Sequence, residues 1–132
     1  MLILAAALRA QLLAAARDAF PAECCGLLEG TREEGIVTVT AFHPAANVSP
    51  APQEAFEIDP AVQFALQRAL RGSGREVVGC YHSHPNGRAE PSARDRAHIY
   101  PEGFIWVIIA TGVIKTFAAF EAPSFQPLTI RV

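Results

Sequence analysis

The spacing of apolar residues along the chain predicts where its strands and helices lie. Apolar residues that run together or alternate with polar ones are typical of strands. Apolar residues three or four positions apart, among residues that favour helix, predict amphipathic helices. These criteria predict strands at 2–4, 23–28, 36–42, 55–58, 77–81, 104–110, 113–120 and 128–132, and helices at 6–19, 60–71 and 92–99.

Gly, Pro and Asp residues mark the boundaries between these elements. The polar residues 29–35 predict a turn between two strands of a hairpin, and residues 43–53, which include three prolines, predict a loop. We interpret this loop as a candidate flap over a site. Asp59 followed by Pro60 is a typical helix start, with Asp as the capping residue.

The order of the elements predicts one α/β domain that covers residues 1–132. Without the short strand at 55–58, strands and helices follow one another as β-α-β-β-α-β-α-β-β-β, which indicates a mixed β-sheet flanked by helices. Hydrophobic residues make up 51% of the 132 residues, which is enough for a core.

Charge and cysteine content narrow the classes of function. The net charge is -2 without a basic run, so a nucleic-acid surface is not indicated. The apolar residues 1–8 are too few for a membrane span and lack the charged start of a signal peptide. Cys24, Cys25 and Cys80 do not have zinc-ribbon spacing, which indicates reduced thiols. We therefore expect a cytoplasmic protein that binds neither nucleic acid nor a membrane; homodimer formation stays open.

Residues 77–95 carry the candidate chemistry. His82 and His84 are two positions apart at the end of a predicted strand, so their side chains share one face. A proline-rich turn then ends the strand, and Ser92 is a good helix N-cap that puts Asp95 in the first helical turn. His82, His84 and Asp95 would form the three-ligand set of a catalytic zinc, with the fourth position left to water.

Each part of this pattern also has an ordinary structural interpretation. Ser92 and Asp95 alone match a helix-start signal, and a lone histidine in a strand is usually structural or exposed. Cys80 shares strand parity with the two histidines and is an alternative fourth ligand, although a catalytic zinc keeps one open site. We expect His43 to be exposed or structural. We expect His98 to lie on the surface, with a role behind the zinc ligands as the alternative.

The motif H-S-H-P at 82–85, followed by Ser92 and Asp95, resembles the signature of the JAMM (JAB1/MPN+) zinc metalloproteases. Glu23 resembles the glutamate that this family carries on an earlier strand, and residues 56–60 resemble its bacterial stand-alone members. The resemblance covers nearly the whole chain in order. It implies the JAMM/MPN fold, a mixed sheet with helices that is similar to cytidine deaminase.

The resemblance assigns chemical roles to the matching residues. One zinc ion per chain would be held by His82, His84 and Asp95, and its bound water would be the nucleophile. Glu23 would accept the proton of this water and then donate it to the leaving amine. Ser92 would donate a hydrogen bond to the oxyanion of the tetrahedral intermediate.

The resemblance also implies a zinc peptidase or isopeptidase, similar to deubiquitinases. Its bacterial members hydrolyse the bond after the C-terminal Gly-Gly of a ubiquitin-like sulfur-carrier protein. Two alternatives are a non-catalytic MPN interaction module and a DNA-repair-associated domain with a similar His-x-His-Pro motif. The complete residue set disfavours the first alternative, and the acidic charge disfavours the second. The motifs of zinc deaminases and of H-E-x-x-H proteases are absent from the sequence.

Overall fold

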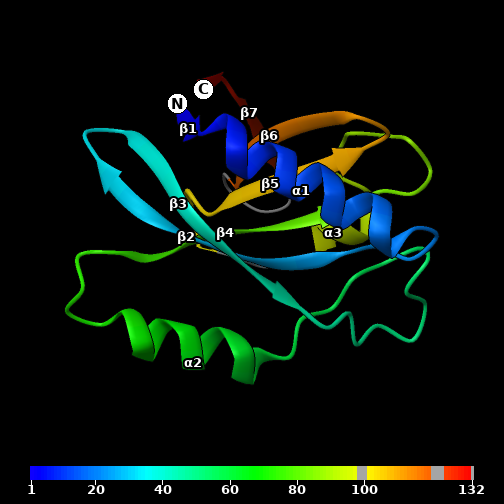
Figure 1. The fold of residues 1–132 in the computed structure, drawn as a ribbon, viewed down its shortest axis with the longest axis horizontal. Helices are drawn as coiled ribbons and strands as arrows, with labels where there is room; N and C mark the ends of the chain where they lie inside the picture. The colour runs from blue at the N-terminus through cyan, green and yellow to red at the C-terminus, as the bar shows by residue number, and fades with distance from the viewer. Residues whose placement is uncertain (98–100, 120–123, 132) are drawn as a thin grey trace.

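The computed structural model describes residues 1–97, 101–119 and 124–131, which form a mixed sheet of eight strands with three helices (Figure 1). The helices are α1 (Ala6–Ala19), α2 (Pro60–Leu70) and α3 (Ala93–Ala97). The strands are β1 (Leu2–Leu4), β2 (Cys25–Glu33), β3 (Ile36–Ala45), β4 (Glu76–Ser83), β5 (Ile105–Ala110), β6 (Val113–Ala119), β7 (Phe125–Leu128) and β8 (Ile130–Arg131). The predicted mixed α/β fold is confirmed. Within the described ranges, no helix is both long and apolar enough to cross a membrane.

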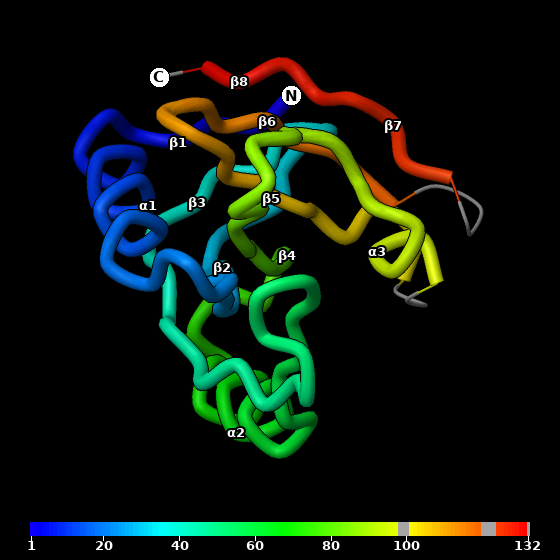
Figure 2. The backbone as a smooth tube through the Cα atoms, turned by 90° about the vertical axis from the view of Figure 1, so that its right-hand side faces the viewer, coloured from blue at the N-terminus to red at the C-terminus, as the bar shows by residue number. Residues whose placement is uncertain are grey.

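The sheet is curled, and one short segment of the chain, β7 and β8, supplies the edge strands on both of its sides. The strand order is β7-β6-β5-β4-β2-β3-β1-β8, with β4 antiparallel to β2 and parallel to β5. Only Thr129 separates β7 from β8 in sequence, yet β7 pairs with β6 and β8 pairs with β1 (Figure 2). This arrangement places β4, which contains His82 and leads directly into His84, near the middle of the sheet.

The two faces of the sheet carry separate apolar clusters. One cluster includes Leu12 of α1 and Tyr81 of β4, and the other includes Leu70 of α2 and Cys80 of β4. The helices α1 and α2 therefore cover opposite faces (Figures 1 and 2). Because side chains alternate along a strand, His82 lies on the same face as Cys80, toward α2.

The start of α2 forms as predicted. Asp59 precedes the helix, and its side chain accepts a hydrogen bond from the backbone N–H of Ala61 at 2.9 Å. Pro60 is the first helical residue, where its missing N–H costs no hydrogen bond. The predicted ranges of β1 and α1 are also confirmed.

The hairpin between β2 and β3 is tighter than predicted. β2 continues to Glu33, and the turn contains only Glu34 and Gly35, whose φ angles are 50° and 78°. The prediction of a turn over 29–35 was wrong because it rested on polarity. The last two residues of β2 are polar because they are exposed, not because the backbone is irregular.

Other strands also differ from the prediction. β3 continues to Ala45, past the end expected at residue 42, so the loop expected at 43–53 begins at residue 46. The strand expected at 23–28 begins at Cys25, because the N–H of Glu23 donates to the loop carbonyl of Pro52 at 2.7 Å. The strand expected at 128–132 is two short strands, β7 and β8, because the segment leaves one edge of the sheet and joins the other.

Residues 55–58 do not form the predicted strand. The carbonyl of Ala55 and the N–H of Glu57 bond to the side chain of Asn47 at 3.0 and 3.1 Å, so a side chain takes the place of a neighbouring strand. His98, Phe120 and Val132, and the end of the helix expected at 92–99, lie outside the described residues.

His43 has the structural role that was one of its two predicted alternatives. Its Nε2 lies 2.9 Å from Oε1 of Glu29, and Arg75 donates to the other oxygen of that carboxylate at 2.6 Å. Glu29 is buried, so the two partners compensate for the loss of its hydration. These contacts join β2, β3 and the residue before β4.

Candidate metal centre and active site

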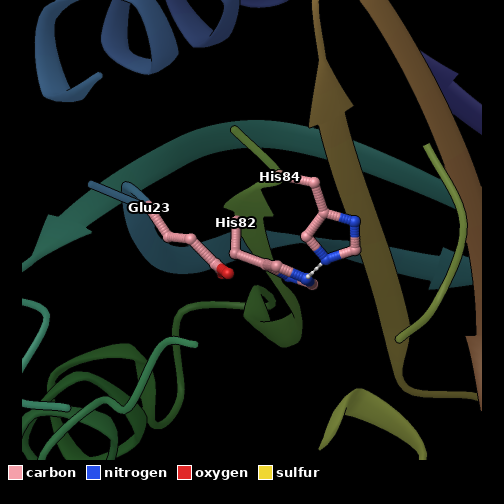
Figure 3. A group of neighbouring side chains, drawn as sticks. All are labelled: Glu23, His82 and His84. Carbon is pink, nitrogen blue, oxygen red and sulfur yellow. Dashed lines mark hydrogen bonds between the residues drawn. The ribbon is translucent and has the colours of Figure 1, made fainter. Parts of the chain in front are cut away.

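The end of β4 brings two imidazoles together in the interior. His82 and His84 are 0% and 5% exposed, and their Nε2 atoms lie 2.8 Å apart (Figure 3). The backbone N–H of His84 donates to the backbone carbonyl of Ile109 at 2.8 Å, which continues the pairing of β4 with β5 past the last residue of β4. The sheet thereby fixes the backbone of both histidines.

Asp95 of α3 completes the cluster. Its Oδ2 lies 3.2 Å from Nε2 of His82 and 3.0 Å from Nε2 of His84. Ser92 and Asp95 also bond reciprocally: the N–H of Ser92 donates to Oδ2 at 2.8 Å, and the N–H of Asp95 donates to Oγ of Ser92 at 3.0 Å. This capping arrangement orients the Asp95 carboxylate toward the histidines and puts the Ser92 hydroxyl next to them.

Glu23 approaches the same histidines from the connection between α1 and β2 (Figure 3). Glu23, His82 and His84 each offer one ligand atom within 4.8 Å of the others, and they could hold a metal ion. Glu23 is 5% exposed, and none of the described residues makes a hydrogen bond to its Oε1. Burial raises the pKa of Glu23 from 4.5 to about 7, although the neighbouring His84 opposes the rise.

A backbone carbonyl determines which nitrogen of His84 can bind a metal. Nδ1 of His84 lies 2.7 Å from the carbonyl oxygen of Arg88, which can only accept, so Nδ1 carries the hydrogen. In the neutral tautomer, Nε2 then presents its lone pair to the cluster. Burial lowers the pKa of His84, but the hydrogen bonds to Asp95 and Arg88 outweigh burial and raise it.

The donor set fits a tetrahedral metal ion. The two Nε2 atoms and Oδ2 of Asp95 lie 2.8–3.2 Å from one another. Ligands at typical zinc bond lengths are about 3.3 Å apart, which is close to this spacing. Nε2 of His84 and Oδ2 of Asp95 lie 3.0 Å apart, a contact that either a proton on the imidazole or a metal ion shared by the two atoms makes favourable. The residues present therefore suit zinc.

Comparison with known proteins assigns the chain to a family. The model of the prokaryotic homologs of the JAB domain matches residues 5–123, which is most of the chain. The chain belongs to the prokaryotic JAB family. The resemblance inferred from the H-S-H-P motif is thereby confirmed.

Individual relatives agree with this assignment. A protein of Haloferax volcanii named desampylase is 36% identical over 135 residues, which span 99% of this chain and 96% of the relative. A probable TtuB-protein conjugate cleaving protease of Thermus thermophilus is 40% identical over 75 residues, which span 57% of this chain and 47% of that protein. The solution structure of a Desulfitobacterium hafniense protein matches with a TM-score of 0.86 at 31% identity, over 99% of this chain and 92% of that one.

This JAB domain is an enzyme, a hydrolase of the JAMM metalloprotease type with a metal-binding group. The assignment rests on the family match, on its protease relatives and on the buried Glu23, His82 and His84. The structure brings all five residues singled out in the sequence to one place, and Glu23 arrives from a loop rather than from a strand.

The JAB domain contains a contact with a candidate metal ligand that sequence reasoning missed. The ring of Phe56 stacks on the imidazole of His82, with centroids 4.2 Å apart and an interplanar angle of 18°. Phe56 is 4% exposed although no strand or helix contains it. An apolar aromatic residue in a polar, proline-rich loop was the available signal, because such a residue must be buried against something.

The other residues considered near the site have structural roles. Ser83 accepts a hydrogen bond from the N–H of Cys24 at 2.8 Å, on the face opposite the histidines. Cys80 lies in the apolar cluster under α2, and burial raises the pKa of its thiol well above the ordinary value. All three cysteines are free thiols, as predicted. In the metal-binding group found among the described residues, Cys80 takes no part.

Proposed function

We propose that this chain is a zinc-dependent peptidase and isopeptidase that hydrolyses the bond after the C-terminal Gly-Gly of a ubiquitin-like, sulfur-carrier-type protein. The proposal rests on one observation: Oδ2 of Asp95 lies 3.2 Å and 3.0 Å from Nε2 of His82 and of His84, and the buried carboxyl of Glu23 lies beside this cluster. A hydrolase of this kind needs three ligands that leave an open position and a separate proton carrier.

In this proposal His82, His84 and Asp95 hold one zinc per chain. Zinc supplies Lewis acidity, which lowers the pKa of a coordinated water toward neutrality and polarises the scissile carbonyl. Because Nδ1 of His84 donates to the carbonyl of Arg88, His84 would bind the ion through Nε2. Phe56 fixes the plane of the His82 ring by stacking on it.

Glu23 acts as the proton carrier. Burial holds the pKa of its carboxyl at about 7, so near neutral pH it can both accept and donate a proton. It takes the proton of the attacking water and delivers it to the leaving amine. The absence of a bond to Oε1 from the described residues leaves that oxygen available for this transfer.

Ser92 stabilises the charge that develops on the carbonyl oxygen. Its Oγ already accepts the N–H of Asp95, and a hydroxyl that accepts one bond can still donate its own hydrogen. Because Ser92 is fixed at the start of α3, this donor is in place before the reaction begins.

The names of the relatives and the burial of the site support this substrate class. The T. thermophilus relative is named for cleaving TtuB-protein conjugates, and the H. volcanii relative is named desampylase. The candidate ligands are 0–5% exposed, so a tail without side chains is best able to bring its backbone close to them. A folded carrier would add the contact area that a few glycines lack.

A cleavage panel tests the proposal. We expect zinc-loaded enzyme to remove C-terminal extensions, and amine-linked partners, from ubiquitin-like sulfur carriers at the bond after Gly-Gly. Mass spectrometry of the products locates the cut. Equal cleavage after the Gly-Gly is changed to Ala-Val would contradict the glycine-tail specificity, and no cleavage of any carrier would contradict the substrate class.

A further inference from the structure

One side chain, Asn47, closes the loop between β3 and α2. Its amide nitrogen faces three backbone carbonyls, and its amide oxygen faces two backbone N–H groups. The partners are the carbonyls of Ala55 (3.0 Å), Glu23 (3.1 Å) and Pro52 (3.5 Å), and the N–H groups of Ser49 and Glu57 (both 3.1 Å). The loop expected to be a flap is thus tied to its own two ends and to Glu23.

Only an asparagine amide suits this position. An amide offers two N–H donors and two oxygen lone pairs, and the contacts of Asn47 use all four. An aspartate keeps the shape and the acceptors but loses both donors, and it would set a carboxylate oxygen against carbonyl oxygens. An alanine loses all of these hydrogen bonds.

The backbone of Glu23 depends on this loop at both of its polar groups. Its N–H donates to the Pro52 carbonyl at 2.7 Å, and its carbonyl accepts from Asn47. Glu23 lies outside β2, so no strand ladder holds it. Since no described residue bonds to its Oε1, the position of the backbone that the loop holds contributes directly to the direction of the carboxyl.

The same loop also supports a metal ligand. Phe56 lies between Ala55 and Glu57, both of which bond to Asn47, and its ring stacks on His82. Asn47 therefore fixes two groups at once: the carboxyl proposed to carry protons and the aromatic ring against which His82 packs.

We propose that Asn47 is a positioning residue of the hydrolysis reaction, which acts by holding the Glu23 backbone and the Phe56 ring at the histidine cluster. The inference rests on the proposed function, in which Glu23 moves the proton. Asn47 touches neither zinc nor substrate, and its effect passes through the loop that it closes.

The first test measures positioning without any turnover. Amide hydrogen exchange is compared among wild type, Asn47→Asp, Asn47→Ala and the control Thr116→Val, each as purified. Thr116 on β6 is 3% exposed and donates one hydrogen bond to the Leu128 carbonyl at 3.1 Å, so Thr116→Val removes a buried hydrogen bond away from the loop. We expect protection of the Glu23 amide to fall about tenfold or more in both Asn47 variants and to stay unchanged in Thr116→Val.

The second test measures catalysis with zinc-loaded protein and a cleavable carrier. We expect kcat to fall about 10- to 100-fold in the Asn47 variants, the cost of a misplaced catalytic group. KM and the zinc affinity, measured by chelator competition, should change by less than about threefold, because the sheet holds the backbone of both histidines and α3 carries Asp95, all independently of Asn47. A kcat loss matched by Thr116→Val, or parallel losses of kcat and zinc affinity, would overturn the proposal.

The two tests separate this proposal from the proposed function. Unchanged exchange at Glu23 in both Asn47 variants overturns the positioning role, whatever the enzyme cleaves. Reduced protection together with wild-type kcat also overturns it. A wild type that binds zinc and cleaves no carrier counts against the proposed function, and the exchange result then decides alone whether Asn47 positions Glu23.

Discussion

Glu23 and Asp95 are two buried carboxyl groups beside the same imidazoles, yet their surroundings drive their pKa values apart. Burial raises the pKa of Glu23 to about 7. Burial acts on Asp95 in the same direction, but hydrogen bonds with His82 and His84 outweigh it and hold the pKa well below its usual range. Under the proposed function, such a divergence separates a permanently charged metal ligand, Asp95, from a group that exchanges protons near neutral pH, Glu23.

Replacing Glu23 with glutamine should separate metal binding from catalysis. Glutamine has nearly the same shape but cannot accept a proton from water. We expect zinc content to stay near that of wild type and turnover to fall about 10²- to 10⁴-fold, the usual contribution of general acid–base catalysis. Steady-state kinetics and metal analysis of the same sample check this result. Near-normal turnover would remove Glu23 from the mechanism.

Ser92→Ala should slow turnover while largely preserving the metal. The loss of one oxyanion donor typically costs about 10²- to 10³-fold in kcat. The variant also loses the acceptor for the Asp95 N–H, which should cost about 1 kcal/mol of stability. Thermal unfolding measures the loss of stability separately, so that the remaining loss of rate can be assigned to the missing oxyanion donor. A kcat equal to that of wild type would limit Ser92 to capping α3.

At the scale of elements, the ion-pair cluster of Glu29, His43 and Arg75 makes stability depend on pH. The hydrogen bond with His43 lowers the pKa of Glu29 below 4.5, with a further contribution from Arg75. A carboxyl group whose pKa is lower in the folded protein than in the unfolded protein stabilises the fold at pH values above its unfolded-state pKa. This contribution disappears as the pH falls through the folded-state value.

Glu29→Gln should therefore destabilise the protein at pH 7 by about 1–2 kcal/mol, since both partners of this buried carboxylate are themselves partly exposed. Urea unfolding at pH 7 and at pH 3 should show the difference from wild type shrinking at the lower pH. Glu33→Gln, at the exposed end of β2, is the matched control and should change little at either pH. If Glu29→Gln lowers the free energy of unfolding by the same amount at both pH values, the charge of Glu29 is not the cause of the loss.

At the scale of the whole molecule, the sequence predicted the elements that obey local rules. The cap at Asp59, the strand parity of His82 and His84, and the Ser92–Asp95 helix start all depend on neighbours within a few residues, and each lies where local chemistry predicts. The JAMM resemblance supplied Glu23, which no local pattern could place beside the histidines.

Long-range contacts produced several of the errors and omissions. The closure of the sheet by β7 and β8 joins residues that are far apart in sequence, and no periodicity encodes that pairing. The bonds of Asn47 replace a strand at 55–58 with a loop that is held by one side chain. The stacking of Phe56 on His82 likewise depends on how that loop folds back over the sheet.

The zinc content of Asp95→Ala, measured beside wild type and Glu23→Gln, tests the central claim most directly. Asp95 Oδ2 contacts both histidine nitrogens, whereas Glu23 is proposed to stay off the metal. Elemental analysis should find about one zinc per chain in wild type and in Glu23→Gln, and almost none in Asp95→Ala. Full zinc occupancy in Asp95→Ala, or loss of zinc in Glu23→Gln, would contradict the assignment of ligand and proton carrier.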